Sequence, residues 1–302
     1  MPDAERGTVT AAFGRKTDGE SFGSLNASPH ADALMTPRLI VTDLDGTLLG
    51  ADHDLHPTTI DTLRALAGQG HHLAFASGRH FQDMQRFRER LGIPVHVIST
   101  NGAYLHDTEG RLITARHLEA SLARQLIALP RPAEVRLNLF HEHEWLIDAE
   151  APGLLALHAH TGFGYRVADP EELDGEGVGK VLYIGEPDAV RRLEATIRAR
   201  HGERLHLTWS LATSLEIMAE GVNKGTALAA LLERLGLGPE ACLAFGDNLN
   251  DTEMLALAGE AHVMANAHPE LADRVPGARR IGHHDERAVA ATLRERFGVS
   301  TT

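Results

Sequence analysis

The sequence predicts an α/β protein whose core is an open, doubly wound, parallel sheet of the Rossmann type, with an α+β domain inserted into it. Near both ends of the chain, short apolar runs alternate with amphipathic helical stretches, which is typical of parallel strands joined by helices. Between these regions the strand signals come in adjacent pairs, which favours antiparallel hairpins. We therefore expect the core to comprise residues 37–102 and 220–302, and the inserted domain to comprise residues 103–219.

The first core region shows the order strand, helix, strand, helix, strand. Residues 39–42, 72–76 and 95–98 are short apolar runs that end in polar or glycine residues, as buried parallel strands do. Pro57 begins the first helix, where its missing N–H costs nothing. Apolar residues at helical spacing over 81–91 predict the second helix.

The pattern changes in the inserted region. Two short strand signals flank the Asp-Thr-Glu-Gly sequence at 107–110, which predicts a hairpin, and residues 135–140 and 144–147 predict a second strand pair. Further elements of the insert are expected as strands at 181–184, 205–208 and 215–218, helices near 118–128, 152–160 and 187–200, and a loop over 175–179.

The α/β alternation then resumes. An apolar stripe over 228–235 predicts a helix, and residues 242–245 predict a buried strand followed by a short helix from about Asp251. Residues 261–264 predict one more strand, and an apolar stripe over 289–297 predicts the last helix.

The composition limits the classes of function. The chain carries 42 Asp and Glu residues against 29 Lys and Arg, a formal net charge of −13, without a long basic run, so nucleic acid and anionic membranes are not expected as partners. No apolar stretch approaches the roughly 20 residues that a membrane helix requires. The single cysteine, Cys242, lies in an apolar run, which predicts a buried, unreactive thiol and a cytoplasmic location.

Residues 1–36 differ from the rest of the chain. They are rich in small and polar residues and have no continuous apolar segment of the kind found in secretory signals. Two interpretations remain open: a disordered N-terminal extension, or natural translation from Met35.

The candidate chemistry lies at the ends of the predicted core strands. Asp43 and Asp45 follow the first strand, and Asp247 follows the strand over 242–245. If these two strands are neighbours, the three carboxylates meet at one edge of the sheet, where they would repel one another unless a cation such as Mg²⁺, which prefers oxygen ligands, lay between them. Ser77 and Lys224 can reach the same crevice, and together this set suits a phosphate bridged to a divalent cation.

These residues carry a resemblance to a known family. Asp-Leu-Asp-Gly-Thr at 43–47, Ser-Gly-Arg at 77–79, Lys-Gly at 224–225 and Gly-Asp-Asn-Leu-Asn-Asp at 246–251 resemble, in order, the four motifs of the haloacid dehalogenase superfamily. The large α+β insertion is similar to the cap of its Cof-type phosphatases. The resemblance covers about residues 37–300 and implies a haloacid dehalogenase core with an inserted cap.

The resemblance implies the roles of the acids. Asp43 would attack phosphorus and form an aspartyl-phosphate, which divides one difficult step into two. Asp45 would protonate the leaving alcohol and then activate water. The side chains of Asp43 and Asp247, with the backbone carbonyl of Asp45, would bind Mg²⁺.

The resemblance also implies the residues that bind the transferring phosphate. Their expected members are Ser77, the backbone amides near Leu44 and Gly78, Lys224 and Asn250. Thr47 and Asp251 would support the site, and Asp251 would orient either Lys224 or a metal-bound water.

Several of these residues have other interpretations. Taken one at a time, the acids are ordinary turn or cap residues, and Ser77 is a helix N-cap; it is their combination that favours catalysis. Arg79 could contact substrate or pair with an acid at the surface. The pairs His71/His72, His141/His143 and His283/His284 lack zinc spacing, so structural or solvated roles are expected. His141, His143, Trp145 and Glu216 could contact substrate, although ordinary cap positions are favoured.

The sequence therefore predicts a cytoplasmic, Mg²⁺-dependent phosphatase of small phosphorylated metabolites, as a monomer or homodimer, with a cap that selects the substrate. Sugar phosphates and phosphorylated cofactors are the expected substrates. Two alternatives stay open. One is a phosphotransferase such as a phosphomutase, which would use the same core. The other is a non-hydrolytic binder of a phosphorylated metabolite, which would have no need of the acid Asp45.

Overall fold

The computed structural model describes residues 37–157 and 161–300, and they form two separate β-sheets. The interpretations of residues 1–36, with Met35 as a possible start, lie outside the described residues, as does the end of the helix expected over 152–160. Both sheets belong to one compact unit, Thr36–Thr302.

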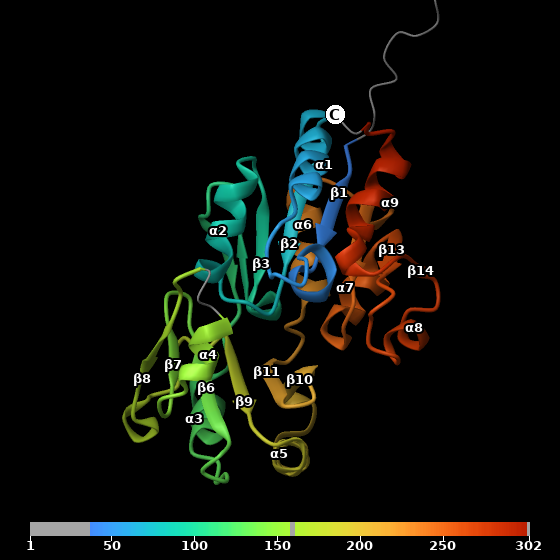
Figure 1. Ribbon diagram of the computed structural model, residues 1–302. Helices are drawn as coiled ribbons and strands as arrows, with labels where there is room; N and C mark the ends of the chain where they lie inside the picture. Colours follow the sequence, from blue (N-terminus) through green and yellow to red (C-terminus); the bar gives the residue numbers. More distant parts are fainter. Residues whose placement is uncertain (1–36, 158–160, 301–302) are drawn as a thin grey trace, which may run out of the picture. The chain divides into compact units, whose positions relative to one another are not determined.

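The core sheet has eight strands in the order β14-β13-β12-β1-β2-β3-β4-β5. From β14 to β3 the neighbouring strands are parallel, and β4 and β5 are added antiparallel. The orange C-terminal strands thus return beside the blue β1 in Figure 1. The strands are β1 (Leu39–Thr42), β2 (His72–Ala76), β3 (His96–Ser99), β4 (Tyr104–His106), β5 (Leu112–Ala115), β12 (Cys242–Gly246), β13 (Glu260–Val263) and β14 (Arg279–Arg280).

Helices pack on both faces of this sheet. One apolar cluster joins the sheet to α1, α2 and α9, and another joins it to α6, α7 and α8. The expected doubly wound α/β core is therefore confirmed. The helices are α1 (Pro57–Gly68), α2 (Phe81–Leu91), α6 (Lys224–Leu235), α7 (Thr252–Leu257), α8 (Leu271–Arg274) and α9 (Ala288–Phe297).

The inserted segment carries the second sheet, in the order β10-β11-β9-β6-β7-β8. One of its faces packs on α3 and α5 in an apolar cluster of its own. This is the expected α+β insert, built from strands β6 (Arg136–Phe140), β7 (Trp145–Ile147), β8 (Tyr165–Val167), β9 (Lys180–Ile184), β10 (Leu205–Leu211) and β11 (Ser214–Ala219), and helices α3 (Ala120–Ile127), α4 (Pro152–Leu157) and α5 (Pro187–His201).

One expected boundary is wrong. The hairpin of β4 and β5 was expected within the insert over 103–219, but β4 pairs with β3, so the hairpin extends the core sheet. The turn signal at 107–110 identifies a hairpin without indicating which sheet its strands join. Because β4 and β5 pair within the core sheet, the insert begins only after β5. The short strands β8 and β14 were also missed, because strands of three and two residues show too little alternation.

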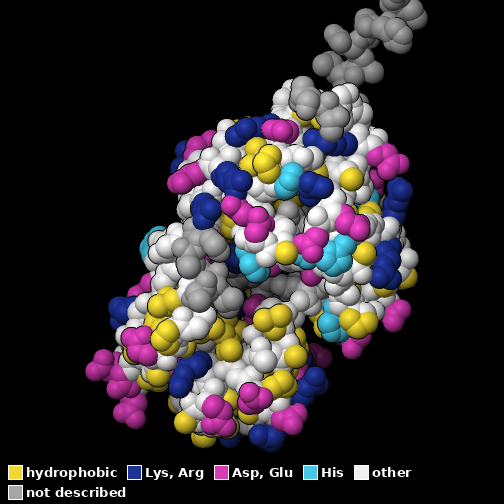
Figure 2. All heavy atoms as spheres, viewed as in Figure 1, with side chains coloured by type: hydrophobic (Ala, Val, Ile, Leu, Met, Phe, Trp, Pro, Cys, Tyr) yellow, Lys and Arg dark blue, Asp and Glu magenta, His cyan; other side chains and the backbone are white. Residues whose placement is uncertain are grey.

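The charged surface and the buried cysteine agree with what the composition predicts. Basic and acidic side chains are interspersed on the face shown in Figure 2. Within the described residues, no helix has the length and apolar character to cross a membrane. Cys242 is buried, and this burial raises the pKa of its thiol to about 12, as expected for an unreactive core cysteine.

Candidate active site

The two strands that carry the acids are neighbours. β1 and β12 are parallel, with Thr42 opposite Phe245. Asp43 directly follows β1 and Asp247 directly follows β12, so both residues lie at the carboxyl ends of two central strands. The backbone N–H of Asp43 continues the pairing by donating to the carbonyl of Phe245 at 3.0 Å. The adjacency on which the predicted site depended is therefore present.

Lys224 brings a buried positive charge to these acids. It is the first residue of α6, which Asn223 caps through a reciprocal hydrogen-bonded pair with Thr226. The ammonium lies 2.9 Å from Oδ1 of Asp43 and 2.6 Å from Oδ1 of Asp251, and the side chain has no exposed surface. Burial alone would lower the pKa of Lys224, but the charges of the two acids outweigh it and raise the pKa above its usual range.

Three carboxylates share this position. Ligand atoms of Asp43, Asp247 and Asp251 lie within 4.8 Å of one another. Burial raises the pKa of Asp43 well above its usual range, and the charges of Asp251 and Asp247 raise it further, against the opposing effect of Lys224. Burial and the charge of Asp251 likewise raise the pKa of Asp247, to about 7. The Lys224 ammonium alone does not compensate the negative charge of these three carboxylates, so the donor set fits a divalent cation.

The three carboxylates are not equivalent as metal ligands. Asp251 already hydrogen-bonds Lys224 through Oδ1 and the backbone N–H groups of Asp247 and Asn248 through Oδ2, at 2.9 and 3.0 Å. Asp251 therefore contacts Lys224, which is one of its two expected roles. Asp43 and Asp247 retain more free oxygen capacity for a cation.

Asp45 is paired with Arg79 and not with Lys224. Arg79 donates from Nε to Oδ2 at 2.6 Å and from Nη2 to Oδ1 at 2.7 Å, and Nη1 bonds Asp83 at 2.8 Å. Burial would raise the pKa of Asp45, but the hydrogen bonds and charge of Arg79, helped by His53, hold it below its usual range. Arg79 thus pairs with an acid, but this acid is Asp45 of the site and not the surface acid that one interpretation expected.

A tight turn holds the first motif against Asp247. Gly46 has φ +74°, and a Cβ atom on it would lie 2.4 Å from Oδ2 of Asp247. Thr47 donates from its hydroxyl to Oδ1 of the same aspartate at 2.7 Å. Asn266 donates to the Gly46 carbonyl at 2.8 Å; it lies outside the four motifs, and the sequence reasoning missed it.

The expected phosphate-binding residues lie at the ends of neighbouring elements. Leu44 directly follows Asp43, and Ser77 and Gly78 follow β2. Ser77 is buried and accepts from the backbone N–H of Arg79 at 3.2 Å. It does not cap the next helix, because His80 caps α2.

Asn250 is linked to a residue outside the four motifs. Its Nδ2 donates to Oδ1 of Asn101 at 3.1 Å, while its own Oδ1 is buried with no hydrogen-bond partner among the described atoms. Asn101 in turn donates to Glu216 of the insert. Sequence reasoning had placed Glu216 among ordinary cap positions or substrate contacts and missed its bond to the core.

Residues of two of the histidine pairs make hydrogen bonds within the chain. Ligand atoms of His283, His284 and Asp285 lie close enough to hold a metal. However, Nδ1 of His283 accepts from the Asp285 backbone, and Nδ1 of His284 faces the Leu49 carbonyl at 2.9 Å and must carry a proton there. His141 contributes its carbonyl oxygen to His80 at 2.8 Å.

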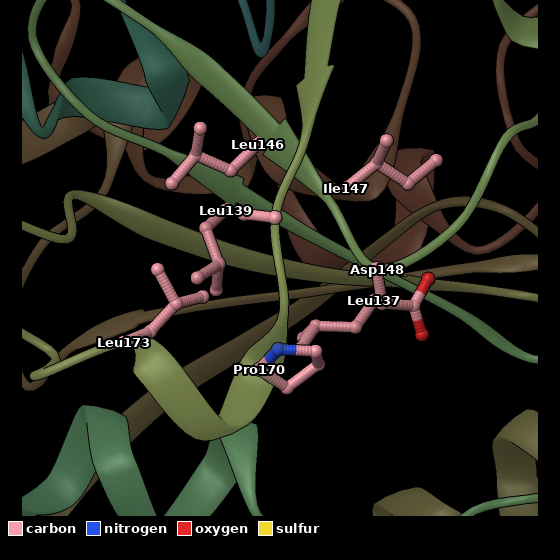
Figure 3. Close-up of a pocket in the computed structure, with 8 residues that line it drawn as sticks. Leu137, Leu139, Leu146, Ile147, Asp148, Pro170 and Leu173 are labelled. Atoms are coloured by element: carbon pink, nitrogen blue, oxygen red, sulfur yellow. The ribbon is translucent and has the colours of Figure 1, made fainter.

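The insert also contains a small apolar hollow, shown in Figure 3. Asp148 is its only charged lining residue and pairs with Arg131 at 2.7 Å. The hollow contains none of the motif residues, and it is a gap in the core of the insert. Its lining consists of Leu137, Leu139, Leu146, Ile147, Asp148, Ala168, Pro170 and Leu173.

Comparisons with known proteins agree with this geometry. Residues 40–293 match the family described as haloacid dehalogenase-like hydrolase. The HMP-PP phosphatase of Cronobacter sakazakii is 36% identical over 256 residues, which are 85% of this chain and 94% of that protein. A haloacid dehalogenase-like hydrolase from B. subtilis aligns with a TM-score of 0.75 and 26% identity, covering 85% of this chain and 99% of that one. A structure from Thermotoga maritima aligns with a TM-score of 0.73 and 26% identity, covering 88% and 98%.

The chain belongs to the haloacid dehalogenase-like hydrolases. The resemblance carried by the four motifs is thereby confirmed, and so is the expected class of enzyme, a phosphatase with a Cof-type cap.

Proposed function

We propose that this protein is a Mg²⁺-dependent phosphohydrolase of small phosphorylated metabolites that uses Asp43 as its nucleophile. The observation that carries the proposal is the meeting of Asp43, Asp247 and buried Lys224 at the carboxyl ends of two adjacent parallel strands. This edge is where open α/β sheets bind their ligands. The remaining core, residues 37–102 and 220–302 with the β4–β5 hairpin, positions these groups under the cap.

The chemistry has two steps. Asp43 attacks phosphorus, the bond from phosphorus to the leaving oxygen breaks, and Asp45 gives that oxygen a proton. Water then attacks the aspartyl-phosphate, Asp45 takes the proton from the water, and phosphate and free Asp43 are released. Arg79 favours the ionised form of Asp45, so the Arg79–Asp45 pair suits the second step, in which Asp45 acts as a base. The first step requires Asp45 to be protonated and turned toward the substrate.

Other groups of the site would bind the metal and the transferring phosphate. Asp43, Asp247 and the Asp45 carbonyl would hold Mg²⁺, which offsets the charge of the transferring phosphate when bound. Lys224, Ser77 and Asn250, with the amides of Leu44 and Gly78, would donate to the phosphate oxygens. Asp251 would keep Lys224 in place, a role supported by its 2.6 Å contact.

The substrate class follows from the cap and from the relatives. An inserted domain over the site favours small molecules over folded phosphoproteins, and the curated relatives are named for HMP-PP. We include that compound with sugar phosphates and phosphorylated cofactors as candidates. We place the enzyme in the cytoplasm, as a monomer or homodimer.

The test is a panel of phosphate esters that includes HMP-PP, assayed for phosphate release with Mg²⁺ and with chelator. Mg²⁺-dependent release, with a clear ranking of substrates, is the expected result. Transfer of the phosphoryl group to an added sugar without phosphate release would instead favour a phosphotransferase. Tight binding without turnover on the whole panel would contradict an enzyme.

A further inference from the structure

A buried ion pair lies on the second sheet and plays no part in the proposed chemistry. Lys180 in β9 and Glu216 in β11 are 2% and 4% exposed, and Nζ lies 3.5 Å from Oε2. Removing two charges from water is expensive, so such a pair contributes little to stability by itself. Burial lowers the pKa of Lys180, although Glu216 opposes that shift. The pair therefore needs an explanation other than the stability of the insert.

Both members of the pair bond the core rather than only each other. Lys180 donates from Nζ to the carbonyl oxygen of Gly78 at 2.8 Å. Glu216 accepts from Nδ2 of Asn101 through Oε2. Gly78 follows β2 and Asn101 follows β3, so two neighbouring strand ends of the core are each bonded to one charge of the pair.

Each of these two core contacts involves a proposed phosphate-binding segment or a residue bonded to one. The Gly78 carbonyl is part of the loop whose amide and Ser77 would bind phosphate. Asn101 accepts from Nδ2 of Asn250 at 3.1 Å and so fixes the orientation of that amide. The second oxygen of Glu216 accepts from the Ser210 hydroxyl at 2.8 Å, so both carboxylate oxygens are used.

The backbone at this contact is also under strain. Thr100 and Asn101 have φ values of +52° and +55°, in the left-handed region that residues with a Cβ atom rarely occupy. Such a conformation persists only where the surroundings impose it, and it is concentrated at functional sites. The bond from Asn101 to Glu216 supplies part of that constraint.

We propose that Lys180 and Glu216 are positioning residues through which the cap fixes the two phosphate-binding segments of the core, the Ser77–Gly78 loop and Asn250. The inference rests on the proposed function, because that function makes these segments the phosphate site. It adds that the phosphate site is complete only when the cap is bonded to the core through this pair.

The test compares wild type with Glu216→Gln and with Lys180→Met/Glu216→Gln. The double variant removes both charges together, so no buried charge remains without its partner. Steady-state hydrolysis of an alkyl phosphate gives kcat and KM, and calorimetry gives the Kd of inorganic phosphate in the presence of Mg²⁺. The assays run well below the Tm of each variant.

The matched control is Arg131→Met/Asp148→Asn, which removes another largely buried ion pair of the insert. Arg131 donates to the carbonyls of Ile127 and Leu129 and to Asp148, which all belong to the insert. We expect the control to lower Tm while leaving kcat, KM and the phosphate Kd within about twofold of wild type, since it leaves the phosphate-binding groups in place.

We expect the double variant to lose at least about tenfold in kcat/KM and to raise the phosphate Kd at least about fivefold, with a smaller loss for Glu216→Gln, since losses of this size follow the misplacement of binding groups. A lower Tm with unchanged kcat, KM and phosphate Kd would overturn the inference. If wild type binds phosphate but hydrolyses no ester, the proposed function fails, and the phosphate Kd of the variants still decides the inference. If wild type does neither, both are overturned.

Discussion

The guanidinium of Arg79 hydrogen-bonds both carboxylate oxygens of Asp45, at 2.6 and 2.7 Å. The same guanidinium bonds Asp83, a fully buried residue of α2 that also accepts from Thr161 of the insert. The group proposed as general acid and base is therefore connected, through two residues, to the cap. A planar fork of donors makes this geometry, and a lysine could not reproduce it.

The substitution Arg79→Lys tests that connection. It keeps a positive charge beside Asp83 but loses the two parallel bonds to Asp45, so we expect kcat on an alkyl phosphate to fall at least about tenfold. The loss should be at least as large on p-nitrophenyl phosphate, because its leaving group needs little protonation and its hydrolysis then depends on the attack of water that Asp45 promotes. Arg111→Lys, which changes a largely exposed arginine paired with the buried Asp107, is the control. A loss confined to the alkyl phosphate would mean that Arg79 acts on protonation of the leaving group and not on Asp45 as the base.

The substitution Gly46→Ala tests the turn that holds Asp247. The added Cβ would lie 2.4 Å from an oxygen of Asp247, so the aspartate must move. We expect the Mg²⁺ concentration for half-maximal rate to rise and the rate at saturating Mg²⁺ to fall at least about tenfold.

The control for that substitution is Gly70→Ala. Gly70 also has a positive φ, +88°, but a Cβ atom on it would meet no atom of the described residues within 4 Å beyond its chain neighbours. The variant should lose about 1 kcal/mol of stability from backbone strain and keep the Mg²⁺ response of wild type. If the two variants have the same kinetics, the contact with Asp247 is not the cause.

Acid sensitivity of the fold should depend in part on His80. Burial lowers the pKa of this ring to about 4, although its bond to the His141 carbonyl and the charge of Asp83 oppose the shift. The unfolded chain, with a pKa of about 6.5, then binds the proton more readily than the fold does. The stability linked to the neutral ring is present above about pH 6.5 and is lost as the pH falls toward 4.

The measurement is Tm against pH for wild type and His80→Asn, since asparagine can still cap α2 without titrating. We expect a shallower fall in Tm for the variant between pH 6.5 and 4. The fall should persist in part, because burial also lowers the pKa of His106 to about 4. His143→Asn, at an exposed ring, should follow wild type. Identical slopes for His80→Asn and wild type would contradict the assignment.

The strand ends could be predicted from the sequence because local patterns determine them. Asp43 and Asp247 each follow an apolar run, and a parallel topology then brings such residues to one edge. The partners of Asp45 and Glu216 could not be predicted in the same way. Glu216 meets Asn101 across 115 positions of the chain, and such contacts leave no periodic signal. The β4–β5 hairpin was assigned to the wrong sheet for a related reason, since a turn signal does not specify the neighbouring strand.

The central claim is that Asp43 is the nucleophile of a metal-dependent phosphatase. The most direct measurement is phosphate release by wild type and Asp43→Asn from the best ester of the panel, with Mg²⁺ and with chelator. The amide keeps the shape of the side chain but is a poor nucleophile, so we expect Mg²⁺-dependent release by wild type and background release by the variant. Release by folded Asp43→Asn at the rate of wild type would contradict the claim.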